Sequence, residues 1–173
     1  MEFCANVKPK IDPSVFIADT ATVIGDVEIG KNSSVWYGAV IRSDGDRVRI
    51  GENVNIQDGA VIHEDAGYPV EIGNNVTIGH KAIVHGCRIG NDSLIGMGAI
   101  LLSGCKIGNN CLVAAGALVT ASMDLPDGSM LMGSPAKTIR PLSDELREEI
   151  AFAANEYVEL GKEFKEGNYK QAR

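Results

Sequence analysis

The three histidines of this sequence are the residues best suited to metal chemistry. His63, His80 and His85 are the only histidines among the 173 residues, and they lie close together in the chain. Three imidazoles with a fourth position open form the ligand set of a catalytic zinc site that binds water. They predict a Zn²⁺ site, and imidazole suits Fe²⁺ and Co²⁺ as well. A purely structural metal and ordinary surface histidines are the other interpretations.

The chain that must position these histidines is built on a period of six residues. An aliphatic residue recurs at this spacing, with breaks in the frame after Ile41, Ile62 and Val84. The series is Ile11, Ile17, Val23, Ile29, Val35, Ile41, Ile50, Ile56, Ile62, Ile72, Ile78, Val84, Ile89, Ile95, Leu101, Ile107, Val113 and Val119. Period six is a multiple of the two-residue period of a strand and does not fit a helix.

Each six-residue unit can supply one short strand and one tight corner, with the aliphatic side chain pointing inward. Three units close a triangular coil, so the series predicts about six coils, stacked roughly 4.8 Å apart as parallel strands. Glycine follows many of the slots and suits corner conformations that other residues resist. The predicted fold is an all-β solenoid, a parallel β-helix of hexapeptide repeats.

Two of the frame breaks predict loops that protrude from one corner of the prism. Residues Asp44 to Asp46 follow the slot at Ile41, and the segment from Glu64 to Pro69 follows the slot at Ile62. Solenoid proteins often carry functional residues on such excursions. We therefore expect chemistry near this corner.

The C-terminal segment predicts a single helix that lies along the prism. Ser143 can cap a helix that begins near Asp144. An apolar stripe follows at helical spacing: Leu146, Ile150, Ala153, Tyr157 and Phe164. A helix of about 20 residues is roughly as long as six coils are high, so it can cover its own prism or a neighbour's. The expected domains are a hexapeptide-repeat β-helix over 1–135 and a C-terminal extension with this α-helix over 136–173.

The six-residue frame arranges the site residues in two columns that point in different directions. Arg42, His63 and His85 each follow an inward slot on the third face of consecutive coils, so their side chains should stack outward about 4.8 Å apart. His80 and Asp58 share a second column, on the second face. One subunit should therefore not unite the three histidines, whereas prisms packed around a three-fold axis could. The frame predicts a homotrimer with three identical sites.

The overall composition argues against several partners. The formal net charge of −7 and the pI near 4.9 offer no basic face for nucleic acid or an anionic membrane. No signal segment and no run of about 18 apolar residues occurs, so we expect a cytoplasmic location. Cys4, Cys87, Cys105 and Cys111 show no CxxC spacing and are expected to be reduced. The frame stacks Cys87 near Cys105, at a distance that a disulfide could span.

The stretches around these residues resemble the γ-class carbonic anhydrase-like family. The matching segments are VWYGAVIRSD (35–44), NIQDGAVIH (55–63), TIGHKAIVHGC (77–87), GMGA (96–99) and GSPAK (133–137). The resemblance covers nearly the whole chain and implies a left-handed prism. It further implies that His63 and His85 of one subunit bind the metal together with His80 of the next.

The same resemblance implies roles for residues around the metal. Gln57 matches the residue that orients the metal-bound hydroxide, which attacks CO2 to give bicarbonate. Arg42 and Asp58 match a salt bridge across the interface, with Asp44 beside them, and Tyr157 resembles a helix tyrosine that overhangs the site. From their positions alone, Arg42 and Asp58 could be a plain interface ion pair, Gln57 a corner hydrogen bond, and Tyr157 a member of the apolar stripe.

Several features leave other functions open. Strongly active members of the family carry an acidic residue directly after the position of Asp44, where this chain has Gly45. Glu64 or Asp65 could relay protons, but neither matches the family's shuttle position. Hexapeptide prisms also host acyltransferases, which need one histidine as a general base and no metal. Hydrolysis of an acyl-CoA thioester by the same metal hydroxide, and a non-catalytic assembly role, are the further alternatives.

Overall fold

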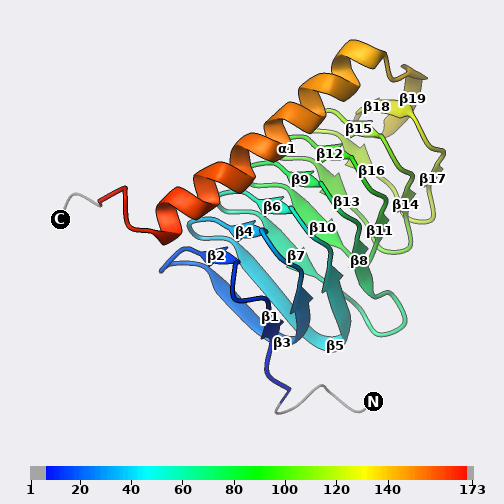
Figure 1. Cartoon of the computed structure of the whole chain (residues 1–173). Helices are drawn as coiled ribbons and strands as arrows, with labels where there is room; N and C mark the ends of the chain where they lie inside the picture. The colour runs from blue at the N-terminus through cyan, green and yellow to red at the C-terminus, as the bar shows by residue number, and fades with distance from the viewer. Residues whose placement is uncertain (1–6, 171–173) are drawn as a thin grey trace.

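The chain folds into a left-handed, three-sided parallel β-helix with one helix along its side (Figure 1). The computed structural model describes residues 7–170. Most strands are only two or three residues long, because each six-residue unit uses the rest of its length for a corner. The fold class predicted from the six-residue period is confirmed.

Each face of the prism is a ladder of parallel strands from successive coils. The first face comprises β1 (Lys10–Ile11), β8 (Val70–Ile72), β11 (Arg88–Ile89), β14 (Lys106–Ile107) and β17 (Asp124–Leu125). The second face comprises β2 (Phe16–Ile17), β4 (Ser34–Val35), β6 (Asn55–Ile56), β9 (Thr77–Ile78), β12 (Leu94–Ile95), β15 (Leu112–Val113) and β18 (Ser129–Gly133). The third face comprises β7 (Val61–His63), β10 (Ile83–His85), β13 (Ile100–Leu101) and β16 (Leu118–Val119). Two long strands, β3 (Thr22–Ile29) and β5 (Val40–Ile50), run from the third face to the first.

The prism is taller than the series ending at Val119 predicts. Leu125 on β17 and Leu131 on β18 continue the six-residue period, and both side chains are buried. The solenoid therefore has about seven turns, where the series predicted about six. A hairpin closes this end, because β18 pairs antiparallel with β19 (Ala136–Pro141).

The core is a stack of aliphatic side chains from the inward slots. Ile41, Ile62 and Val84 are register partners on the third face, and all three are fully buried. Each such side chain stabilises the fold by about 1.5–3 kcal/mol on leaving water. Small buried alanines at the corners, such as Ala60 and Ala82, complete the layers. This stacking holds every outward side chain at a defined height on its face.

Glycine follows many of the inward slots because the next coil leaves no room there for a Cβ atom. A Cβ atom on Gly90 would lie 2.6 Å from the backbone carbon of Gly108 in the next coil. The φ angle of Gly90 is not in the left-handed region, which corner residues such as Asn53 and Gly59 occupy instead. The expectation that these glycines serve a corner conformation is therefore wrong. The close approach of adjacent coils explains them.

The two insertions differ in structure. Residues Asp44 to Asp46 do not form a protruding loop, because β5 continues through the corner and pairs with β3 over both of its ends. Asp44, Gly45 and Asp46 themselves have no strand partner, and the pairing on both sides of them holds this segment in the corner. The segment from Glu64 to Pro69 does form a loop, closed by an antiparallel bridge between Asp65 and Tyr68. Figure 1 shows this loop leaving the prism between β7 and β8.

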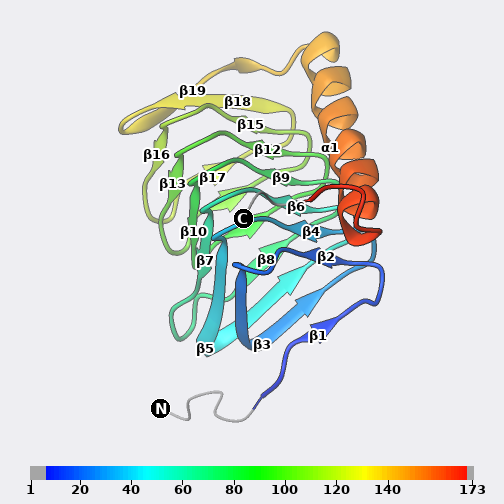
Figure 2. The same ribbon diagram turned by 90° about the vertical axis from the view of Figure 1, so that its left-hand side faces the viewer.

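One helix, α1 (Asp144–Lys165), lies along the second face of its own prism (Figure 2). The Ser143 cap is confirmed, since its side chain accepts a hydrogen bond from the backbone N–H of Leu146. Near the other end of α1, Phe164 packs against Phe16 and Trp36. Within residues 7–170, no helix combines the length and apolar character that crossing a bilayer requires.

The described cysteines are buried free thiols, and Cys4 lies outside the described residues. Cys87 and Cys105 occupy adjacent coils, since the residues that follow them, Arg88 and Lys106, are register partners. A hydrogen bond with Cys105, together with burial, holds the pKa of the Cys87 thiol well above its usual range. The same hydrogen bond lowers the pKa of Cys105. A disulfide between these two residues stays the alternative to the expected reduced pair.

Candidate metal centre

The first column of site residues stands on the third face. Arg42, His63 and His85 are register partners on β5, β7 and β10, so their side chains leave the prism one above the other. His63 and His85 each end a strand, directly before the corner. The side chains of both histidines are partly exposed. The parallel ladder thus brings two imidazoles to the surface at adjacent heights.

The two imidazoles of this column face each other. His63 Nδ1 lies 3.0 Å from His85 Nε2, and the ring centroids are 5.0 Å apart. Nitrogen ligands at about 2.0–2.1 Å from a tetrahedral zinc ion are roughly 3.3 Å from one another. The pair therefore fits two adjacent positions of such a coordination shell, and imidazole donors suit zinc, iron or cobalt.

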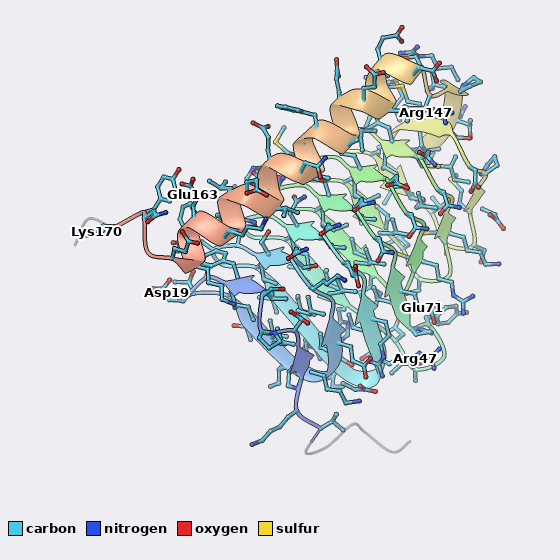
Figure 3. All side chains as sticks on the ribbon, in the orientation of Figure 1. Asp19, Arg47, Glu71, Arg147, Glu163 and Lys170 are labelled. Carbon is cyan, nitrogen blue, oxygen red and sulfur yellow. The ribbon has the colours of Figure 1, made fainter. Side chains whose placement is uncertain are left out.

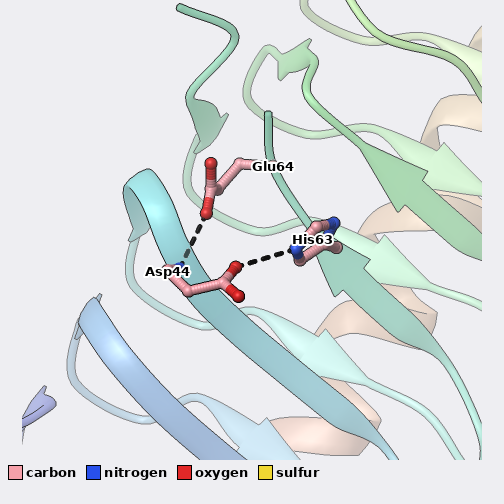
Figure 4. Close-up of side chains that lie close together, drawn as sticks. All are labelled: Asp44, His63 and Glu64. Atoms are coloured by element: carbon pink, nitrogen blue, oxygen red, sulfur yellow. Dashed lines mark hydrogen bonds and ion pairs between the residues drawn. The ribbon is translucent and has the colours of Figure 1, made fainter. Parts of the chain in front are cut away.

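Asp44 engages the other ring nitrogen of His63. Its Oδ1 atom lies 3.0 Å from His63 Nε2 (Figure 4), and its Oδ2 atom accepts a hydrogen bond from Arg42. The hydrogen bond with His63, with the positive charge of Arg42, holds the pKa of the Asp44 carboxyl below its usual range. A carboxylate on the outer nitrogen of a metal-binding histidine orients the ring and raises its basicity. Asp44 is positioned to do this for His63.

Ser103 and Asp65 lie at the outer nitrogen of His85. Ser103 Oγ is 2.9 Å from His85 Nδ1 and donates a hydrogen bond to Asp65 Oδ2 at 3.0 Å. Asp65 Oδ2 is itself 3.6 Å from His85 Nδ1. Ser103 is not among the residues that the six-residue frame or the family resemblance assigns to the site. Its spacing of 18 residues from His85, one coil along the column, is the signal that could have found it.

The second column stands at the corner between the second and third faces. His80 Nδ1 lies 2.9 Å from Asp58 Oδ2, in the stacking that the frame predicts. Gln57 Oε1 accepts a hydrogen bond from the backbone N–H of His80 at 3.2 Å. Gln57 Nε2 donates to Asn55 Oδ1 at 3.0 Å, and Asn55 Nδ2 donates to Thr77 Oγ1 at 2.8 Å. Because Gln57 is buried, these bonds fix its amide beside His80.

Tyr157 of α1 stands beside the second column, on the wall of a cavity of about 480 Å³. Gln57 and His80 line the same cavity, together with apolar residues of β12 and β15. The Tyr157 ring also packs edge-on against Trp36, with centroids 5.4 Å apart. Burial raises the pKa of the Tyr157 hydroxyl, and the charge of Asp58 adds to the shift. Tyr157 therefore belongs both to the apolar stripe and to the wall of this cavity.

A single subunit does not unite the three histidines. His63 and His85 end strands of the third face, whereas His80 lies at the corner where that face begins. Within residues 7–170, the potential metal ligands that converge in one subunit are Asp44, His63 and Glu64, whose ligand atoms lie within 4.8 Å of one another. A site with all three imidazoles thus needs a second copy of the chain.

The salt bridge expected between Arg42 and Asp58 does not form within one chain. Arg42 pairs with Asp44, and Asp58 pairs with His80. The two columns stand at opposite edges of the third face, and each of these residues pairs on its own side of that face. Their salt bridge stays a prediction about the assembly.

The chain is similar to known hexapeptide-repeat proteins over most of its length. A family model described as bacterial transferase hexapeptide (six repeats) matches residues 8–43 and 86–121. Protein YrdA of Escherichia coli is 48% identical over 171 residues, which cover 94% of this chain and 93% of that protein. A solved structure of a hexapeptide transferase family protein from Anaplasma phagocytophilum has 40% identity and a TM-score of 0.88, covering 91% of this chain and 93% of that one.

Several relatives carry the name of an enzyme, carbonic anhydrase. The "Probable carbonic anhydrase" of Methanocaldococcus jannaschii is 50% identical over 150 residues, 87% of this chain and 94% of that protein. "Gamma carbonic anhydrase 2, mitochondrial" of Arabidopsis thaliana is 42% identical over 158 residues, 88% of this chain; the alignment spans 57% of that longer protein. With its hexapeptide repeats and these similarities, the chain belongs to the γ-class carbonic anhydrase-like family.

Proposed function

We propose that the protein is a metal-dependent γ-carbonic anhydrase that catalyses the reversible hydration of CO2 between the subunits of a homotrimer. The relatives named carbonic anhydrase support this reaction. The observation that carries the proposal is the facing pair of imidazole nitrogens, His63 Nδ1 and His85 Nε2, 3.0 Å apart. His80 of a neighbouring subunit completes the ligand set.

The outer surfaces of the three faces support a trimer. The first face carries charged side chains such as Glu71, which pairs with Arg47 (Figure 3) and Arg88 and suits contact with water. The second face lies under α1. The third face carries an outward apolar row between the two columns: Val40, Val61, Ile83, Ile100 and Leu118. An apolar row suits burial against a second copy of the chain, which would bring His80 to the first column.

The residues around the metal have separate tasks. When bound, the metal would lower the pKa of water and so supply a nucleophile at neutral pH. Asp44 and Ser103 hold the rings of His63 and His85 by their outer nitrogens. Gln57 uses one lone pair of its carbonyl oxygen for the N–H of His80, and the second lone pair can accept an O–H from the reacting water. An amide fixed in this way orients the water toward CO2 without rearrangement.

Asp65 is the acidic residue suited to exchange protons between the site and solvent. Its side chain is 55% exposed and contacts His85 through Ser103. Glu64, the other acidic residue after His63, is buried and hydrogen-bonded to the backbone. We assign the relay of protons to Asp65 and none to Glu64.

Metal analysis combined with a CO2 hydration assay tests the proposal. Protein purified without added metal should contain one metal ion per subunit and should hydrate CO2 in a stopped-flow assay, and a chelator should abolish the activity. His80→Ala should lose the metal, whereas the neighbouring variant Lys81→Ala should keep it. A wild-type protein without metal would contradict the proposal.

The cavity beside His80 favours a second candidate function, the hydrolysis of acyl thioesters. Its volume of about 480 Å³ is within the range of about 300–1,000 Å³ typical of pockets for larger ligands, and CO2 would fill a small part of it. Leu94, Met97 and Leu112 give it an apolar lining next to Gln57 and His80. An apolar acyl chain could occupy this space, with its carbonyl group next to Gln57 and His80. Water would add to the carbonyl carbon, the C–S bond would break, and the thiol would leave with a proton.

Thiol release from acetyl-, butanoyl- and octanoyl-CoA distinguishes these functions. Metal-dependent hydrolysis that rises with chain length, and that Ala114→Phe in the cavity wall suppresses, would favour the thioesterase. Acetyl-CoA turnover that persists after chelation and needs an acceptor would favour a transferase, as the names of the hexapeptide relatives suggest for those proteins. CO2 hydration without thioester turnover would leave the anhydrase as the function.

A further inference from the structure

A buried carboxylate lies directly behind the metal centre. Glu64 is 1% exposed, and it is the one charged side chain among the buried residues of the described chain. Its Oε1 atom accepts hydrogen bonds from the backbone N–H groups of Asp44 at 2.8 Å (Figure 4) and Gly45 at 2.7 Å. Its Oε2 atom has no hydrogen-bond partner within residues 7–170. Burying a carboxylate is costly, so its position here calls for a physical explanation.

The strand ladder explains why these two N–H groups need such a partner. On the side of the following coil, β5 pairs with β7 up to the partners Arg42 and His63. It pairs with β8 only from the partners Val48 and Val70 onward. Between these points the following coil forms the loop from Glu64 to Pro69, and no strand lies beside Asp44 and Gly45 on that side. The Oε1 atom of Glu64 supplies the acceptor that a paired strand would have supplied.

Gly45 provides the room that this carboxylate occupies. A Cβ atom at position 45 would lie 3.1 Å from Glu64 Oε2 and 3.7 Å from Oε1. The φ angle of Gly45 is not in the left-handed region, so space rather than backbone conformation makes glycine suitable. Gly45 and Glu64 therefore form a matched pair. This pair accounts for a glycine where the family resemblance implies an acidic residue in strongly active members.

We propose that Glu64 is a positioning residue for the metal centre, which holds the backbone of Asp44 and Gly45 so that the Asp44 carboxylate stays on His63 Nε2. The side chains of Asp44 and Arg42 are 51% and 47% exposed, so packing does little to restrain this carboxylate. The backbone anchor restrains it instead. Asp44 in turn orients the His63 ring, whose other nitrogen faces His85. The inference rests on the proposed function, since it assigns Glu64 to the site that would hold the metal.

Amide hydrogen exchange in metal-free protein and metal affinity together test this role. In Glu64→Ala, the Asp44 and Gly45 amides should exchange at least about 10-fold faster, while the Val48 amide in the same strand should be unchanged. Metal affinity should fall by about 10–100-fold, the usual effect of removing an outer partner of a metal ligand. Glu64→Gln keeps an acceptor oxygen and should restore much of both properties. Glu71→Ala, on the first face, is the matched control.

A double-mutant cycle separates positioning from a general loss of stability. If Glu64 acts through Asp44, Glu64→Ala should weaken metal binding no further in an Asp44→Ala background. Gly45→Ala should reproduce the faster exchange, because its Cβ atom would press on Glu64 Oε2. Unchanged exchange at Asp44 and Gly45, or additive losses in the cycle, would overturn the inference. If the wild-type protein binds no metal, the proposed function fails, but the exchange measurement still tests the anchor.

Discussion

At the scale of single residues, the site depends on polar partners that fix side chains otherwise free to rotate. Asp44 and Ser103 each contact one imidazole from behind, and Asn55 holds the amide of Gln57. Imidazole rings and amides have broad terminal torsions, so their direction is set by such hydrogen bonds more than by their own rotamers. Each of these functional side chains therefore depends for its orientation on a neighbouring polar residue that takes no part in the reaction.

Gln57→Ala tests this division of tasks. The variant should keep its metal, because Gln57 is not a ligand, but should hydrate CO2 about 10²-fold more slowly, because the reacting water loses its fixed partner. Metal analysis and stopped-flow kinetics on the same sample measure the two effects. Asn55→Ala removes the anchor but keeps the amide, so its loss of rate should be smaller. Loss of metal from Gln57→Ala would show that the residue serves the ligand set instead.

At the scale of elements, the corner between the first and second faces is held by a ladder of side-chain oxygens. Along this corner, a side-chain Oδ1 atom accepts a hydrogen bond from a backbone N–H group one coil earlier, at 2.8 Å in each case. The acceptors Asn91, Asn109 and Asp127 bind the N–H groups of Asn74, Asn91 and Asn109, respectively. Each oxygen satisfies an N–H group that the corner would leave exposed. Asp127 ends the ladder with a charged acceptor, which makes this corner sensitive to acid.

The stability of this corner should fall at low pH. Hydrogen bonds from the Asn109 side chain and backbone hold the pKa of Asp127 below its usual value. Because the pKa of Asp127 is lower in the folded state than in the unfolded state, the stability that its ionised carboxylate contributes is complete above the unfolded-state pKa. This stability is lost as the pH falls through the folded-state pKa. The Tm of Asp127→Asn should therefore lie below that of the wild type at about pH 6 and approach it at about pH 3. Asp19→Asn, at another exposed corner, is the control; a constant Tm difference across this range would contradict the prediction.

Two classes of glycine should respond differently to substitution. Gly90 lies against Gly108 of the next coil, so Gly90→Asn should force the coils apart and cost about 1–3 kcal/mol or more. Gly38 has a φ of 67° and open space around its Cβ position, and asparagine tolerates this conformation, so Gly38→Asn should cost much less. Chemical denaturation of both variants measures the difference. Equal losses would mean that coil-to-coil contact does not limit position 90.

At the scale of the whole molecule, the three faces have three different surroundings. Charged pairs cover the first face, α1 covers the second, and the third face carries the outward apolar row. The two columns of site residues stand at the two edges of this third face. Assembly and metal binding should therefore depend on the same surface.

Ile100→Glu places a charge in the apolar row and should dissociate the trimer. The solenoid itself should stay folded, because the Ile100 side chain points outward and is 36% exposed in one chain. In the proposed site, His80 comes from a neighbour, so the metal should be lost with the trimer. Light scattering and metal analysis measure the two losses. Arg88→Glu on the first face should leave both unchanged, and a metal-bound monomer would rule out a shared site.

The six-residue period by itself determined the fold, the inward core and the two columns. In a solenoid each coil contacts mainly its neighbours, so spacing along the chain converts directly into height and face. The same reasoning put Arg42, His63 and His85 in one stack and His80 with Asp58 in another. It failed at Asp44 to Asp46, because the pairing of β5 with β3 on both sides of this insertion could not be read from the frame.

Only the tertiary structure decided which atoms meet. The burial of Glu64 under Gly45, the facing nitrogens of His63 and His85, and the seat of α1 on its own second face depend on side-chain packing. Spacing fixes where a Cβ atom lies, but the direction of the side chain beyond it follows from the space and hydrogen-bond partners that several coils leave together. The position of each site residue is thus a property of the repeat, and its orientation is a property of the folded chain.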